Sequence, residues 1–237
     1  MKAELIKDRC NKNDCHVVVT ESIFTARNMD EKDMEKAYSL RHLVFAEELR
    51  WAPTDPSGLE VDKYDSISDH FGVFAGEELL AYLRLIRSDN RFMLENEFIE
   101  LVSNDHTIRK YRDTSEISRL CLARRARDYK TMSTDFGTYD ITMLLYKCVY
   151  RWCKENKVRY LYFVVAQQVF RLLNARGFPC DLVGEPKKMP DSIVAVAAIL
   201  DWRKFEMRSV SKKPRLLAWL TNQPKSTNPR EMAAATA

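Results

Sequence analysis

The sequence predicts an α+β domain of three layers, with helices on both faces of a central mixed, largely antiparallel sheet. An antiparallel hairpin comes first, because the apolar runs 70–74 and 79–86 flank the turn signal Ala75-Gly76-Glu77-Glu78. Strands and helices then alternate, which adds parallel pairing to the sheet. Of the 237 residues, 46% are apolar, enough for one sizeable core, so we expect a single domain over residues 1–220.

The remaining elements follow from apolar periodicity, turn residues and helix caps. In the N-terminal half we expect a loose arm (1–20) ending in a short strand (17–20), a helix from Asp30 that stops before Pro53, an irregular acidic loop (52–68), and short helical turns around 97–102. In the C-terminal half we expect a strand (116–122), a helix (139–156), a strand (160–165), a helix (169–175) closed by Gly177, strands (181–183, 193–200) and a disordered tail (221–237).

The strand at 116–122 is apolar in outline, yet it carries a carboxylate, a hydroxyl and a guanidinium. Because successive side chains of a strand point to opposite faces, we expect Glu116 and Ser118 on one face and Arg119 on the other. A buried charge costs several kcal/mol unless it is paired. These residues therefore belong either to a structural ion-pair network or to a functional site.

Charge is unevenly distributed along the chain, although the formal net charge is only +4. Residues 45–70 hold seven acidic and two basic side chains, and residues 119–130 hold five basic and one acidic. This separation suits a cationic ligand at one place and an anionic partner at another, although two solvated faces would give the same pattern. The basic segment lacks interleaved stacking aromatics and the acidic loop would repel phosphate, so we expect no nucleic-acid partner.

No apolar N-terminal segment resembles a signal peptide and no run is long enough to span a membrane, so we expect a cytoplasmic protein. Six scattered cysteines indicate reduced thiols rather than a disulfide framework. Cys10, Cys15 and His16 would supply half of a zinc site. No second pair with ligand spacing follows, so we expect no metal.

The polar clusters form one combination: Arg41-x3-Phe45-x5-Trp51, then Glu60-x-Asp62-x-Tyr64-Asp65, then Arg84, then Glu116-x-Ser118-Arg119. This combination resembles the acyl-homoserine-lactone (autoinducer) synthase family from about Ala37 to Gly177. The resemblance implies a GNAT-like acyltransferase fold and the synthesis of a quorum-sensing signal. The acyl chain would pass from acyl-carrier protein to the amine of S-adenosylmethionine, a substrate rather than a cofactor. Lactone closure would then release methylthioadenosine.

Site roles follow from this reading. Aminolysis of a thioester needs a proton acceptor, and a partly buried carboxylate with a raised pKa is suitable. Glu116 is the first choice for this proton acceptor, acting through a water. Asp62 or Asp65 could share the role. Ser118 lies on the same strand face as Glu116 and is also assigned to the catalytic site. The alternatives are an ion pair of Glu116 with an arginine, and loop capping by the aspartates. For substrate binding we name Arg41, Arg84 and Arg119 for carboxylates, Phe45 and Trp51 for the sulfonium, and Phe163 for the acyl chain.

The acyl donor is inferred from residues 123–130. Acyl-CoA-using relatives carry a glycine-containing loop that holds the pyrophosphate, whereas residues 123–127 contain no glycine. The docking surface for an acidic carrier protein is therefore predicted at Arg124, Arg125, Arg127 and Lys130. Phe163 falls where relatives that prefer 3-oxo chains carry a threonine, which favours an unsubstituted acyl or aryl chain.

Two other readings remain open. N-acyl amino acid synthases share the acidic loop and the Glu-x-Ser-Arg strand, and would transfer the acyl group to a free amino acid without forming a lactone. Trp51 is the feature that favours S-adenosylmethionine. The other is a non-enzymatic adaptor or nucleic-acid-binding protein with a basic patch.

Overall fold

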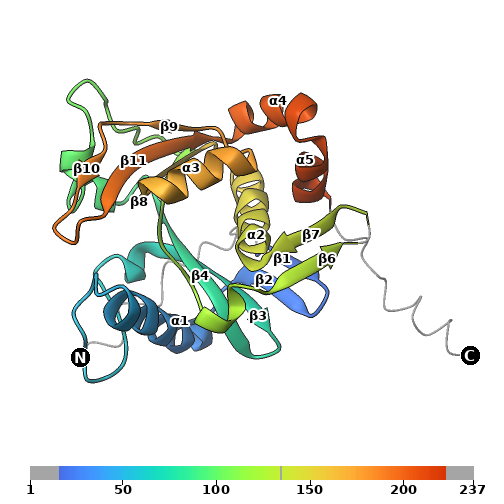
Figure 1. Cartoon of the computed structure of the whole chain (residues 1–237), viewed down its shortest axis with the longest axis horizontal. Coiled ribbons are helices and arrows are strands. Elements are labelled where there is room, and N and C mark those ends of the chain that lie inside the picture. The colour runs from blue at the N-terminus through green and yellow to red at the C-terminus, as the bar shows by residue number, and fades with distance from the viewer. Residues whose placement is uncertain (1–15, 134, 223–237) are drawn as a thin grey trace, which may run out of the picture.

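The computed structural model describes residues 16–133 and 135–222 (Figure 1). Their main sheet has the strand order β1-β2-β3-β4-β5-β8-β11-β10, with β9 also paired to β11. Only the β5–β8 pair is parallel, which confirms the mixed, largely antiparallel sheet. The strands are β1 Val18–Glu21, β2 Phe24–Asn28, β3 Ser68–Ala75, β4 Glu78–Arg87, β5 Thr114–Leu122, β8 Tyr160–Ala166, β9 Cys180–Leu182, β10 Lys187–Lys188 and β11 Val194–Asp201. A separate hairpin joins β6 Lys130–Ser133 to β7 Gly137–Asp140.

Helices cover both faces of the sheet, as the three-layer prediction requires. One face packs against α1 (Met34–Arg41), whose Ala37 and Leu40 meet Tyr82 of β4. The other face carries the larger core, built on α2 (Ile141–Glu155) with Trp152 fully buried. The remaining helices on this side are α3 Gln167–Arg176, α4 Trp202–Lys212 and α5 Pro214–Thr221. None of the described helices is long and apolar enough to cross a membrane.

The helix predicted to begin at Asp30 and to stop before Pro53 is present, but it is not one regular α-helix, because it has three parts. A 3-10 turn (Glu31–Asp33) precedes α1, and a π-helical segment (His42–Glu48) follows it. The wide π turns end with the carbonyl oxygen of Phe45 accepting the N–H groups of Trp51 at 2.7 Å and Ala52 at 3.1 Å. This folds the chain back, so Trp51 lies beside Phe45 rather than one turn further along a helix.

Several elements were not predicted: β2, the β6–β7 hairpin, β10, α4 and α5. The hairpin of β3 and β4, the strand β5, the helices α2 and α3, and Gly177 as the left-handed cap of α3 were predicted. The expected arm includes β1, whereas residues 1–15 and 223–237 lie outside the described residues. Cys10 and Cys15 therefore lie outside the described residues. Cys121, Cys148, Cys153 and Cys180 are free and buried.

Two irregularities of β5 position the site. First, β5 and β8 pair only from Thr114 and Tyr160 to Ile117 and Phe163, and then separate. Second, the ladder to β4 shifts so that β5 has one extra residue, and Arg119 adopts φ 55°. This β-bulge corrects the alternation expected from sequence, because Arg119 ends on the same face as Ser118 instead of the opposite one.

Candidate active site

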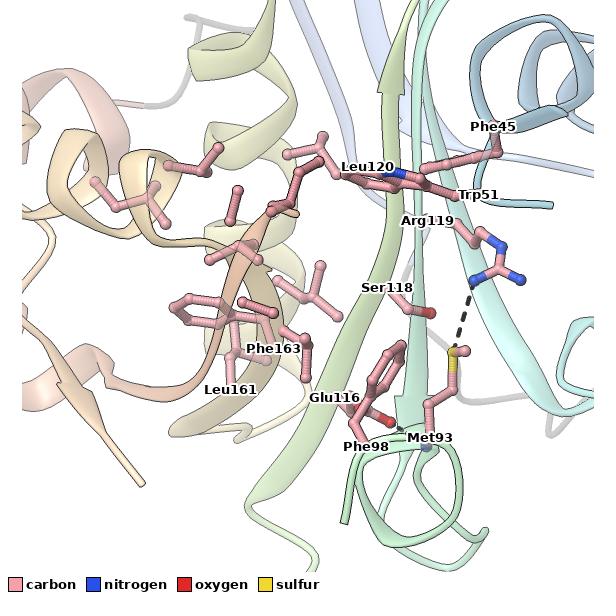
Figure 2. A pocket seen from close by; sticks show the side chains of 18 of the residues that line it. Phe45, Trp51, Met93, Phe98, Glu116, Ser118, Arg119, Leu120, Leu161 and Phe163 are labelled. Atoms are coloured by element: carbon pink, nitrogen blue, oxygen red, sulfur yellow. Dashed lines mark hydrogen bonds between the residues drawn. The ribbon is translucent and has the colours of Figure 1, made fainter. Parts of the chain in front are cut away.

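A cavity of about 640 Å³ opens where β5 and β8 separate (Figure 2). Most of its lining residues are apolar, and many of them lie on β8, α2, α3 and β11. Six of the predicted site residues line it: Phe45, Trp51, Glu116, Ser118, Arg119 and Phe163. The structure therefore brings together residues that are more than a hundred positions apart in the sequence.

Glu116 is 1% exposed, and two backbone amides hold its carboxylate. Met93 donates its N–H to Oε2 at 2.6 Å and Leu94 donates to Oε1 at 2.9 Å (Figure 2). Burial raises the pKa of Glu116 to about 7, against the opposing effects of these amides and of the Arg84 guanidinium. A carboxylate with this pKa can accept a proton near neutral pH and release it again.

Three arginines and three carboxylates form a buried cluster next to Glu116. Arg84 donates to Asp62 at 2.5 and 2.8 Å and to Asp65 at 2.6 Å. Arg41 donates to Asp65 and to Glu60, both at 2.5 Å. Arg119 completes the cluster, donating to Glu60 at 3.0 Å and lying 2.9 Å from Asp62. The formal charges of these six side chains sum to zero.

The cluster limits what its carboxylates can do. Burial opposes ionisation of Asp62, but its bonds to Arg84 prevail and hold the pKa of Asp62 below its ordinary value. A carboxylate with a lowered pKa is a poor proton acceptor at neutral pH. Arg41 and Arg84 are fully buried, whereas the side chain of Arg119 is 22% exposed and lines the cavity. Arg119 is thus the guanidinium of the cluster that a ligand can reach.

An aromatic wall borders the cluster on the α1 side. The rings of Phe45 and Trp51 stack with centroids 6.4 Å apart, and Trp51 is 49% exposed. The guanidinium of Arg119 lies 5.5 Å from the Phe45 ring (Figure 2). Aromatic faces next to carboxylates attract a cation through both the ring quadrupole and the full charges.

Ser118 and Phe163 face the cavity from different strands. The hydroxyl oxygen of Ser118 accepts a hydrogen bond from Nε of Arg84 at 2.9 Å, which ties β5 to the charged cluster. Phe163 lies across the cavity on β8, where its ring offers no hydrogen-bond donor (Figure 2).

Sequence reasoning missed four contributors. Met93 and Leu94 act through backbone N–H groups, which no side-chain motif reveals. Glu60 stood in the acidic motif without an assigned role, and it bridges two arginines. His70 contacts the backbone oxygen of Asp65 at 2.9 Å and the Tyr82 hydroxyl at 2.7 Å. These two contacts tie the end of the acidic loop to β4.

The four basic residues predicted to dock a carrier protein do not line the cavity. They are exposed, in the 3-10 turn Arg124–Ala126 after β5 and in the segment that leads into β6. Arg125 pairs with Glu78, and Arg127 pairs with Glu48 at 2.6 Å. Arg124 and Lys130 form no ion pair with the described part of the chain, although Arg124 contributes to lowering the pKa of Glu48.

A family model described as autoinducer synthase matches residues 25–209. The chain belongs to this autoinducer synthase family. This autoinducer synthase is 25% identical over 174 residues to an acyl-homoserine-lactone synthase of Vibrio anguillarum, covering 71% of this chain and 86% of that protein. It is 28% identical over 149 residues to one of Aeromonas hydrophila, covering 62% and 69%. The predicted family and acyltransferase activity are therefore confirmed, and lactone synthesis is supported over N-acyl amino acid synthesis.

Solved structures share the fold of this autoinducer synthase. The CoA-dependent acyl-homoserine lactone synthase BjaI with MTA has a TM-score of 0.65 at 21% identity, over 80% of this chain and 81% of that one. The synthase LasI has a TM-score of 0.62 at 20% identity, over 79% and 90%. FeeM, an N-acyl amino acid synthase from uncultured soil microbes, has a TM-score of 0.54 at 15% identity, over 80% and 96%. The likeness confirms the predicted GNAT-like α+β fold.

Proposed function

We propose that this protein transfers an acyl group from acyl-carrier protein to the α-amine of S-adenosylmethionine and then closes the homoserine lactone. The observation that carries the proposal is Glu116, a buried carboxylate with a pKa of about 7 at the rim of an apolar cavity. The family supports the reaction class, and a structure of the relative BjaI contains SAM and isopentyl-CoA.

In the first step Glu116 accepts a proton from the amine, directly or through a water. The freed lone pair attacks the thioester carbonyl, so a C–N bond forms and the C–S bond breaks. The nitrogen loses a second proton as the amide forms, so that one of the two protons goes to the departing thiolate of the carrier and the other returns to the solvent. The amides of Met93 and Leu94 support this role, because they fix the carboxylate while each oxygen keeps a second lone pair for the incoming proton.

The amine substrate is proposed to bind between the aromatic wall and the charged cluster. Its sulfonium would meet the exposed face of Trp51 beside Phe45, and its carboxylate would meet Arg119. The buried Arg41, Arg84 and Asp65, together with the partly exposed Asp62, would hold this frame rigid. We therefore assign positioning to the two aspartates and the proton transfer to Glu116.

In the second step an oxygen of the substrate carboxylate attacks the carbon next to the sulfonium. A C–O bond closes the lactone, the C–S bond breaks, and methylthioadenosine leaves as a neutral thioether. This step needs no proton acceptor. A rigid site that keeps the carboxylate near that carbon is sufficient, which suits the paired and buried cluster.

The acyl donor is proposed to be a carrier protein that docks at Arg124, Arg125, Arg127 and Lys130, with its acyl chain in the cavity. Because Glu78 and Glu48 compensate two of these charges, Arg124 and Lys130 are expected to dominate the attraction. The absence of glycine from residues 123–127 supports the same donor. Localisation in the cytoplasm, where both substrates would be available, is part of this proposal.

The test is an assay of the purified protein with acyl-carrier protein and S-adenosylmethionine, followed by mass spectrometry. We expect acyl-homoserine lactone and methylthioadenosine in equal amounts. An open N-acyl amino acid, formed when free amino acids replace S-adenosylmethionine, would contradict the assignment of the amine. A higher kcat/KM with acyl-CoA would contradict the assignment of the donor and leave the lactone chemistry standing.

A further inference from the structure

One polar group in the apolar part of the cavity has no partner. Tyr146 of α2 lines the cavity, and its ring packs edge-on against Phe178 with centroids 5.7 Å apart. Its hydroxyl forms no hydrogen bond with any residue that the structure describes. Burial raises the pKa of Tyr146 well above the ordinary tyrosine value, so the hydroxyl keeps its proton and is a hydrogen-bond donor.

Tyr146 belongs to the compartment under α2 and α3, beyond β8. In the sheet, Leu161 of β8 stands opposite Leu200 of β11, which in turn stands opposite Cys180 of β9, and all three line the cavity. Glu116 lies on the other side of β8, on β5, with its carboxylate turned toward Met93 (Figure 2). An acyl chain that starts at Glu116 therefore reaches this compartment with its distal part.

The Tyr146 side chain is half-buried, and an acyl chain without polar groups would displace water from its hydroxyl and leave that hydroxyl unsatisfied, which is destabilising. The described residues offer it no direct partner, because Phe178 is apolar, the Cys180 thiol is a weak hydrogen-bonding group, and the nearby charges of Arg176 and Asp140 pair with each other at 2.6 Å. We propose that Tyr146 donates a hydrogen bond to an oxygen atom in the distal half of the acyl chain. The enzyme would then prefer a distally hydroxylated or keto-substituted acyl donor over the plain chain. This inference rests on the proposed function for the identity of the reaction.

The test compares acyl-carrier proteins that carry one chain length, either plain or with a single hydroxyl at successive positions. For the wild type we expect kcat/KM to be about ten- to a hundred-fold higher for one distal isomer than for the plain chain. Tyr146→Phe should abolish this preference, so that its kcat/KM no longer differs between the distal isomer and the plain chain. Tyr150→Phe is the matched control, because the Tyr150 hydroxyl bonds Glu206 at 2.8 Å and does not line the cavity.

A preference that survives Tyr146→Phe would overturn the proposal, and so would a wild type that treats all isomers alike. Calorimetry with free hydroxylated and plain fatty acids tests the hydrogen bond from Tyr146 independently of catalysis. Hydroxylated acids bound about ten-fold more tightly by the wild type than by Tyr146→Phe would support it; equal binding would refute it. If no donor yields lactone, the proposed function fails, while this binding comparison still judges Tyr146.

Discussion

Replacing Glu116 with glutamine keeps the volume of the side chain and removes its ability to accept a proton. General bases contribute about 10²–10⁴-fold to catalysis, so we expect kcat for lactone formation to fall by at least about 100-fold. In the wild type, kcat/KM should rise with pH along a limb with an apparent pKa of about 7, the value that burial gives this carboxyl group. That limb should be absent from the residual activity of the variant.

The same substitution should change the pH dependence of stability. The pKa of Glu116 is raised from 4.5 to about 7 on folding, so the protonated carboxyl group favours the folded state. Its contribution is complete below pH 4.5 and is lost as the pH rises to about 7. At 1.36 kcal/mol per pKa unit, this loss is about 3 kcal/mol. Since glutamine does not ionise, the variant should gain about that much relative to the wild type between pH 4.5 and 7.

Urea unfolding at pH 4.5 and pH 8 measures the stability change. Release of the free thiol from the acyl thioester measures turnover. Glu100→Gln is a suitable control, because Glu100 lies nearby on the surface and pairs only at 3.8 Å with Lys187. It should alter neither quantity. Turnover of Glu116→Gln within a few-fold of wild type would refute the assignment of the base. A stability difference independent of pH would refute the raised pKa.

Three further predictions concern the surroundings of Glu116. Trp51→Ala should weaken S-adenosylmethionine binding about ten- to thirty-fold in calorimetry if the ring meets the sulfonium, and undiminished affinity would contradict that placement. Arg84→Met removes the guanidinium shared by the buried Asp65 and the partly exposed Asp62 and should cost about 3–5 kcal/mol in urea unfolding; a loss under 1 kcal/mol would contradict the tight cluster. Reversing Arg124 and Lys130 to glutamate should raise KM for acyl-carrier protein and flatten its salt dependence, unlike Lys212→Glu on α4, and unchanged KM would count against the docking surface.

The elements predicted correctly are those whose own residues specify them. The stripe of α2 repeats at helical spacing over fifteen residues, and Gly177 adopts the left-handed conformation that ends α3. By contrast, α4 has few apolar residues and depends on the Asp201 cap and on packing of Trp202 and Phe205 into the core. The π-helical segment is a local departure from the ordinary helix, and apolar spacing does not distinguish the two.

The same distinction, between features specified by local residues and features that depend on the rest of the fold, holds for the site. The motif residues gather where the sequence places them, because each lies on a predicted element or in the acidic loop. The side of Arg119 was mispredicted because alternation holds only for a regular strand, and the bulge is set by pairing with β4. The partners of Glu116 were missed because they are main-chain N–H groups of a turn in residues 88–113, a segment without clear periodicity.

The neutrality of the charged cluster explains how Glu116 can act as a base beside three guanidinium groups. A net positive charge next to Glu116 would stabilise its carboxylate and lower its pKa, and both Arg84 and Lys110 act in that direction. Asp62 and Asp65 each accept a hydrogen bond from Arg84, so most of its positive charge is offset before it reaches Glu116. The acidic loop therefore has two consequences at once. On the proposed mechanism it builds the frame for the amine substrate, and it offsets the charge of the Arg84 guanidinium that acts on Glu116.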